Sequence, residues 1–186
     1  MAVDQPTTKK WTHDDLLALP DEGARYELID AELYELPMPN EPHQRASRNL
    51  IILLLPAATQ DGAEWYHAPT RVYLPPDGER GVEPDLLYFF PDGNTSRSYR
   101  GIEGAPDLVV EILSPSNPEH DEEDKRTWYA QAGVREYWIV SPEFRAVEVL
   151  VLEGGEYQTL VLARGEDPVT STVFTELRFP AAAIFA

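Results

Sequence analysis

A glutamate stands inside an apolar segment that the sequence predicts to be a buried strand. The segment APDLVVEILSPS, residues 105–116, surrounds Glu111 with leucine, valine and isoleucine side chains. Moving an ionised carboxylate out of water costs several kcal/mol unless the group is paired, protonated or bound to a cation. Glu111 is therefore either the partner of a structural ion pair or part of a functional site.

Two further ionisable residues could join Glu111. Asp85 opens the predicted strand PDLLYFF, and an antiparallel pairing of the two strands would bring the carboxylates together. Lys125 lies in the next predicted helix and is the only lysine after residue 10. A compact ammonium can sit beside two carboxylates and a water, whereas a guanidinium is planar and forked. The alternative is that Lys125 makes ordinary surface pairs with the acidic residues 121–124.

The hydrophobic pattern predicts an α+β fold with a mixed β-sheet flanked by helices and an N-terminal hairpin. We expect a short helix capped by Thr12, the hairpin over RYELIDAELYEL, a main helix after Asn40 and a second helix over HDEEDKRTWYAQAG. Strands are predicted at 64–68, 70–74, 84–90, 106–113, 135–141, 146–152 and 156–162, with a loop from Pro91 to Gly104. Residues 1–10 should form a flexible tail, and residues 11–186 a single domain with one core.

Composition limits the classes of protein that fit. The chain has no cysteine, which excludes disulfides and thiolate metal ligands, and no apolar run near the ~20 residues of a membrane span. Its first residues show no apolar export signal, so we expect a cytoplasmic location. The formal charge of −18 repels nucleic acid through the overall field, and it fits equally well an acidic surface that serves solubility.

Four ordered motifs resemble those of the Uma2 family of putative restriction endonucleases. They are YELIDAELYELP, EPDLLYF, RGIEGAPDLVVEILSPSN and DKRTWYAQAGVREYWIV. The likeness runs from about Leu16 to about Tyr157. This resemblance implies the PD-(D/E)XK, restriction-endonuclease-like fold and a hydrolase that cleaves DNA with the help of a divalent cation.

The resemblance also implies roles for particular residues. Asp85, after Pro84, and Glu111 match the two acidic metal ligands of that superfamily, and Lys125 matches a lysine that orients or activates water. The usual position of that lysine, two residues after the second acid, is occupied here by Leu113.

An earlier assisting acid matches Glu32. The family commonly has glycine before this glutamate, and this chain has Ala31, which makes the tight turn and the aim of Glu32 less certain. The expected catalytic residues are therefore Asp85, Glu111, Lys125 and Glu32.

Mg²⁺ or Mn²⁺ is the expected cofactor. These ions prefer oxygen ligands and are held by one or two carboxylates together with substrate phosphate. The expected metal ligands are Asp85, Glu111 and the backbone carbonyl of Ile112. Without the ion, clustered carboxylates repel one another, so at least one of their pKa values should rise.

Candidate substrate contacts surround this cluster. Arg45 on the main helix and Arg71 would form part of a local positive rim, and Tyr129 shares a helix face with Lys125. His43, in the first turn of the main helix, could approach the cleft or be a structural histidine. Two such rims in a homodimer would suit the two strands of a duplex.

Three hypotheses remain open. The first is a Mg²⁺-dependent endonuclease acting on DNA. The second is a catalytically inactive nuclease-fold interaction module, which the −18 charge and the leucine at position 113 favour. The third is a purely structural ion pair between Glu111 and an arginine. The three differ in what they predict for metal binding and for substitution of Glu111.

Overall fold

The computed structural model describes residues 9–20, 25–29, 31–36, 38–75, 80–91, 93, 95–114 and 119–186. The helices in these ranges are α1 (His13–Leu17), α2 (Glu41–Gln60), α3 (Glu119–Ala132) and the 3-10 helix η1 (Ala181–Phe185). The strands are β1 (Arg25–Ile29), β2 (Glu32–Leu36), β3 (Glu64–His67), β4 (Val72–Leu74), β5 (Arg80–Val82), β6 (Leu86–Phe89), β7 (Ser96–Ser98), β8 (Gly101–Glu103), β9 (Leu108–Ile112), β10 (Glu136–Ser141), β11 (Ala146–Glu153), β12 (Glu156–Arg164), β13 (Pro168–Thr170) and β14 (Arg178–Pro180).

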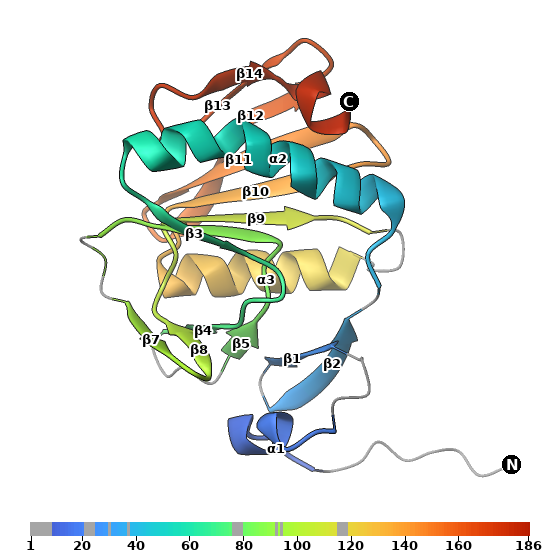
Figure 1. Cartoon of the computed structure of the whole chain (residues 1–186), viewed down its shortest axis with the longest axis vertical. Helices are drawn as coiled ribbons and strands as arrows, with labels where there is room; N and C mark the ends of the chain where they lie inside the picture. Colours follow the sequence, from blue (N-terminus) through green and yellow to red (C-terminus); the bar gives the residue numbers. More distant parts are fainter. Residues whose placement is uncertain are drawn as a thin grey trace, which may run out of the picture.

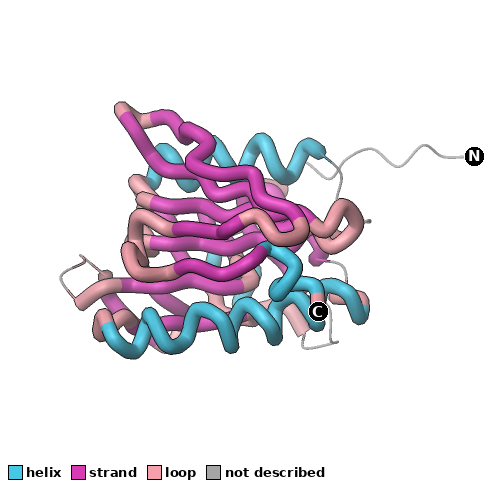
Figure 2. The backbone as a smooth tube through the Cα atoms, turned by 90° about the horizontal axis from the view of Figure 1, so that it is seen from above, coloured by secondary structure: helices cyan, strands magenta, loops and turns pink. Residues whose placement is uncertain are grey.

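The central sheet has the strand order β12-β11-β10-β9-β6-β3. Its strands β9 and β10 run parallel, and the other neighbouring pairs are antiparallel. Figures 1 and 2 show α2 on one face of this sheet and α3 on the other. Because both faces are covered, all residues of β6, β9 and β10 are buried, which explains their nearly continuous apolar sequences.

Helix α2 is fixed at its beginning and along its apolar face. The side chain of Asn40 accepts a hydrogen bond from the backbone N–H of His43, and Pro42 occupies the first turn, where an amide donor is not needed. Leu50 and Leu54 are fully buried against the central sheet. The position of the first turn, including His43, is therefore set by both the cap and the core.

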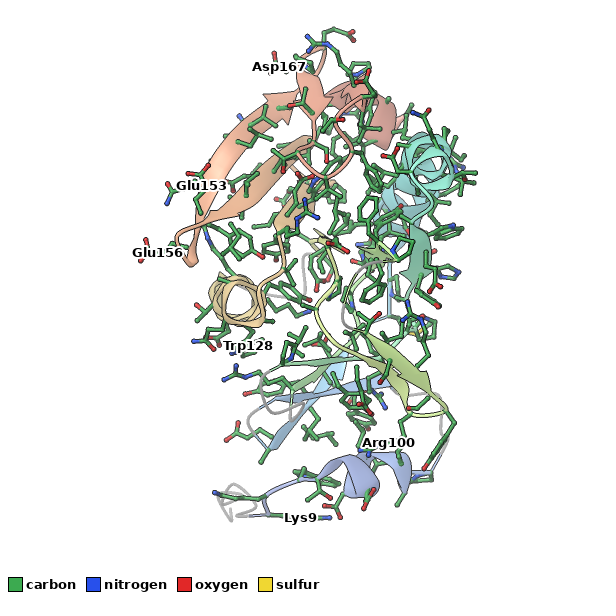
Figure 3. All side chains as sticks on the ribbon, turned by 90° about the vertical axis from the view of Figure 1, so that its left-hand side faces the viewer. Lys9, Arg100, Trp128, Glu153, Glu156 and Asp167 are labelled. Carbon is green, nitrogen blue, oxygen red and sulfur yellow. The ribbon has the colours of Figure 1, made fainter. Side chains whose placement is uncertain are left out.

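Helix α3 lies between the central sheet and a second sheet, as Figure 3 also shows. The second sheet has the order β2-β1-β5-β4-β8-β7. Trp128 and Tyr129 of α3 share one hydrophobic cluster with Val82 of β5 and Val109 of β9. A side chain of α3 can therefore touch residues of both sheets.

The predicted α+β class, with mixed sheets flanked by helices, is confirmed. The described strands form two six-stranded sheets and the two-stranded sheet β13-β14, where one mixed sheet was expected. The predicted loop at 91–104 contains β7 and β8. These three-residue strands, SRS and GIE, are too short to show an alternating pattern. Residues 1–8 of the predicted tail lie outside the described residues. No helix within the described part of the chain has the length and apolar character needed to cross a membrane.

Candidate active site

The two carboxylates singled out from the sequence meet at one end of the central sheet. Strands β6 and β9 are antiparallel, with Leu86 opposite Val110, so the residue before β6 lies beside the end of β9. Asp85 is that residue, and its Oδ2 accepts a hydrogen bond of 2.8 Å from the backbone N–H of Ile112. In Figure 1 this end lies on the right, where β9 ends and where α2 and α3 begin.

His43 holds the carboxylate of Asp85 from the side of α2. Its Nε2 lies 3.2 Å from Oδ2 and 3.2 Å from Oδ1 of Asp85. The imidazole is buried, and its Nδ1 has no hydrogen-bond partner among the described residues. His43, one of whose two predicted alternatives was to approach the cleft, therefore reaches the cluster and orients Asp85.

Lys125 brings a buried positive charge to Glu111. Its Nζ lies 3.4 Å from Oε1 of Glu111 and 3.3 Å from Oε1 of Glu27, and 7% of its side chain is exposed. Tyr129, one turn further along α3, donates a hydrogen bond of 2.6 Å to the same oxygen of Glu111. Both residues that share this face of α3 therefore contact Glu111.

The surroundings of Glu111 favour its protonated form. Burial raises its pKa from 4.5 to about 8, against the lowering effect of Lys125, and the nearby charges of Asp85 and Glu27 raise it further. The hydrogen bond from Tyr129 acts in the lowering direction. The pKa of the Tyr129 hydroxyl is itself well above its usual value, first because it is buried and then because Glu111 is near. The expected rise in a carboxylate pKa within the cluster is thus present at Glu111.

The acid that reaches Lys125 from the N-terminal hairpin is Glu27 on β1. It is 1% exposed, and its Oε1 also accepts a hydrogen bond of 2.9 Å from the backbone N–H of Glu83. Glu32, the acid expected from the resemblance, is exposed on β2 and accepts a hydrogen bond of 3.1 Å from Tyr34. No described contact joins Glu32 to the cluster.

The turn before Glu32 has the conformation that glycine favours. Ala31 has a φ of 64°, in the left-handed region, and its carbonyl accepts a hydrogen bond from the backbone N–H of Trp11. The substitution of glycine by alanine at this position therefore leaves the tight turn in place, at a cost in backbone strain.

The arginines predicted to contact substrate lie in different environments. Arg71 forms a salt bridge of 2.6 Å with Glu83 and donates to the carbonyl of Tyr26, which ties it to the hairpin strand that carries Glu27. Arg45 is exposed at the beginning of α2 and is paired with Glu41 at 2.6 Å. Of the two, Arg45 is the one that faces solvent.

The cluster fits a divalent ion that takes few protein ligands. Among the described residues, no group of three or more histidine, aspartate and glutamate side chains is arranged to hold a metal. Asp85 and Glu111 are two hard oxygen donors, and Mg²⁺ is commonly held by one or two carboxylates with water and phosphate completing its shell. The donor set is therefore adequate for Mg²⁺ or Mn²⁺ and poor for a metal that needs a full protein cage.

Comparisons with known proteins identify the family and a solved structure of similar fold. A family model described as Uma2, putative restriction endonuclease, matches residues 13–182. Among solved structures, the chain is similar to a putative nuclease belonging to DUF820 from Anabaena variabilis ATCC 29413, with a TM-score of 0.76 and 22% identity over 94% of this chain and 97% of that chain. No curated protein matches the sequence. At this identity the solved structure shows the fold alone, whereas the family model covers most of the sequence, so the chain belongs to the Uma2 family.

Proposed function

We propose that this protein is an endonuclease that hydrolyses phosphodiester bonds of DNA with the help of Mg²⁺ or Mn²⁺. The observation that carries the proposal is the convergence of Asp85, Glu111 and the buried ammonium of Lys125 at one end of the central sheet. Membership of the Uma2 family supports the same class of activity.

The electrostatics of the two carboxylates support a metal-binding role. With a pKa of about 8, Glu111 keeps its proton at neutral pH as long as no cation compensates its charge. A divalent ion held by Asp85, Glu111 and the carbonyl of Ile112 would supply an acidified water and would stabilise negative charge developing on phosphorus. The bound cation would then account for the burial of Glu111, because it would compensate the negative charge of both carboxylates.

We assign to Lys125 the stabilisation of the negative charge that develops in the transition state. Contacts with Glu27 and Glu111 hold its ammonium in one place, so little reorganisation is needed when negative charge develops on the phosphate. An arginine could not replace it, because the planar guanidinium has a different shape and never gives up its proton. His43 acts indirectly, because it contacts the carboxylate of Asp85 and orients it.

Cleavage assays test the proposal directly. Supercoiled plasmid and single-stranded DNA circles are incubated with the protein in Mg²⁺, in Mn²⁺ or in a chelator, and we expect cleavage only with metal. Glu111→Gln should abolish it. Glu148→Gln is the matched control, because Glu148 lies on β11 in the same cross-strand row as Glu111, two strands away through Ile139. A wild-type protein that cuts no DNA with either metal, or that cuts no better than Glu111→Gln, would contradict the proposal.

Calorimetry separates the enzyme from an inactive nuclease-fold module. The module has no use for a cation, so it predicts no Mn²⁺ binding that depends on Asp85. We expect Mn²⁺ to bind to the wild type and to Glu148→Gln, and to lose most of its affinity in Asp85→Asn. Equal titration curves for all three proteins would favour the module.

A homodimer is the active unit that we propose for duplex DNA. The two strands of a duplex run in opposite directions, and a two-fold dimer places one site at each strand. Linear product from plasmid at low enzyme concentration, together with a dimeric mass in sedimentation, is the expected result. A stable monomer that still cuts both strands in one binding event would contradict the dimer.

A further inference from the structure

We propose that a cavity beside the carboxylate cluster binds a backbone phosphate of the DNA strand, a few nucleotides from the phosphate that is cleaved. The cavity has a volume of about 250 Å³ and is lined by Glu41, Pro42, Arg45, Pro142, Arg145 and Phe185. The inference rests on the proposed function, because it takes the nucleic-acid strand as the ligand. It adds a second contact that positions this strand across the end of the sheet.

One wall of the cavity comes from the first turn of α2. Arg45 is two residues after His43, and the imidazole of His43 contacts Asp85. The same helical turn therefore reaches the carboxylate cluster with one side chain and the cavity with another. A strand bound through a metal ion at Asp85 and Glu111 would pass this turn.

The opposite wall comes from the turn between β10 and β11. Arg145 lies in this turn, which begins after Ser141. Val140, one residue earlier, is paired with Ile112, whose N–H binds Asp85. Neighbouring strands are ~4.8 Å apart and residues advance ~3.3 Å, so the turn begins roughly 10 Å from Asp85. That distance exceeds the ~3.4 Å axial rise between successive phosphates of one strand, so the cavity would face a phosphate other than the one that is cleaved.

Two arginines and one glutamate line the cavity, so the lining carries one net positive formal charge, in a chain whose formal charge is −18. Arg45 donates to Glu41 from Nε at 3.0 Å and from Nη2 at 2.6 Å. Arg145 donates from Nη1 to the carbonyl of Phe185 at 3.3 Å and lies 5.6 Å from the centre of that ring. A guanidinium has five N–H donors, so these contacts hold both groups in position and leave donors for a phosphate.

Arg145 occupies the left-handed position of the turn between β10 and β11. Its φ of 46° costs a residue other than glycine or asparagine ~1–2 kcal/mol. Phe144, next to it in the turn, is 66% exposed, and its apolar ring can lie against a sugar or a base.

Binding assays with matched arginine variants test the phosphate site. We measure the affinity for fluorescently labelled DNA at several salt concentrations for Arg45→Gln, Arg145→Gln and Arg135→Gln. Arg135 is the control: it is exposed, it pairs with one acid, Asp107, at 3.1 Å, and it precedes β10 at the end opposite to Arg145. Each cavity variant should bind roughly tenfold more weakly and lose about one unit of salt dependence, and the control should match the wild type.

Glu41→Gln should strengthen DNA binding, whereas the two arginine variants should weaken it. This change removes the acid that neutralises Arg45, so DNA should bind a few-fold more tightly. A loss of folding cannot produce tighter binding. Steady-state cleavage supplies a second readout, because a contact away from the reacting phosphate should raise KM more than it lowers kcat when it is lost.

The outcomes separate the two proposals. If Arg45→Gln and Arg145→Gln bind DNA as Arg135→Gln does, the phosphate site is wrong, even if the wild type cuts DNA. If the wild type cuts nothing but the two cavity variants still lose affinity, the nuclease proposal fails and the phosphate site stands. A wild type without measurable affinity for DNA overturns both.

Discussion

Two buried glutamates on neighbouring parallel strands of the central sheet differ in their neighbours: one is surrounded by neutral hydrogen-bond donors, the other by charged groups. Glu136, at the start of β10, is 0% exposed and accepts hydrogen bonds from five neutral donors. These donors are the indole N–H of Trp138, the hydroxyls of Ser171 and Thr172, and the backbone N–H groups of Thr172 and Val173. Glu111, near the end of β9, accepts a hydrogen bond from Tyr129 and lies beside a second carboxylate and an ammonium.

The difference separates a structural carboxylate from a functional one. The donors around Glu136 come mainly from the segment after β13, so the carboxylate fastens this segment to the sheet. Its charge is spread over hydrogen bonds that need no further ligand. The charges around Glu111 conflict, since burial and Asp85 oppose ionisation while Lys125 favours it. A cation would resolve that conflict.

Glu111→Gln should show the largest effect, and it should act on catalysis. We expect metal-dependent cleavage to fall roughly a thousandfold, which corresponds to about 4 kcal/mol of transition-state stabilisation. Stability at neutral pH should not fall and should rise, because glutamine keeps the shape of the protonated side chain and, unlike glutamate, takes up no proton on folding. Single-turnover cleavage and urea unfolding measure the two quantities. A large loss of stability with no dependence on metal would instead indicate the structural ion pair.

Glu136→Gln should lower the stability of the protein and leave its cleavage rate unchanged. The amide NH₂ would face N–H and O–H donors, leaving several buried groups unsatisfied, at a cost of about 3 kcal/mol in unfolding free energy. Cleavage per folded molecule should stay near the wild-type rate, because no described contact joins Glu136 to Asp85, Glu111 or Lys125. Urea titration provides the stability. A variant as stable as the wild type would contradict the structural role.

The pH dependence of stability should report on the surroundings of Glu111. The pKa of Glu111 is raised from 4.5 to about 8 in the folded state, so between these values the folded chain keeps a proton that the unfolded chain has lost. Without divalent ions, stability should therefore fall as pH rises through this window and level off above it. We expect wild type and Glu111→Gln to diverge by about 2 kcal/mol between mildly acidic and mildly alkaline solution. Parallel curves for the two proteins would show that Glu111 has an ordinary pKa.

Ala31→Gly should have the smallest effect, and it tests the hairpin that brings Glu27 to Lys125. Glycine adopts the φ of 64° at this position without strain, and its greater freedom in the unfolded chain offsets part of the gain. We expect stability to rise by about 0.5–1 kcal/mol. Differential scanning calorimetry measures the change, with cleavage unaltered. A less stable variant would mean that the alanine methyl group packs favourably enough to outweigh the strain.

The Asp85 and Glu111 pair could be predicted because it required one inference, the antiparallel pairing of two apolar strands. Glu27 could not be found in the same way. Its strand alternates with Tyr26 and Leu28, and this pattern normally places the charged residue in solvent. Here the charged side chain is buried because Lys125 compensates it from a helix nearly a hundred residues later. The approach of His43 to the cleft was one of two predicted alternatives, but its partner Asp85 could not be named, because the two residues are distant in the sequence.

The short strands were hidden for a related reason. β7 and β8 contain only three residues each, and they are placed by pairing with each other and with β4. Such strands depend on tertiary contacts that a local pattern does not contain. The long buried strands and the capped helices, in contrast, carry their signals within their own residues.

The ammonium of Lys125 joins carboxylates that belong to different sheets, Glu27 from one and Glu111 from the other. A chain whose hairpin is not docked would still hold both carboxylates proposed as ligands of the ion, but its lysine would lack one of the two contacts that orient it. If the protein cleaves DNA as proposed, a partly folded copy would therefore be impaired in cleavage.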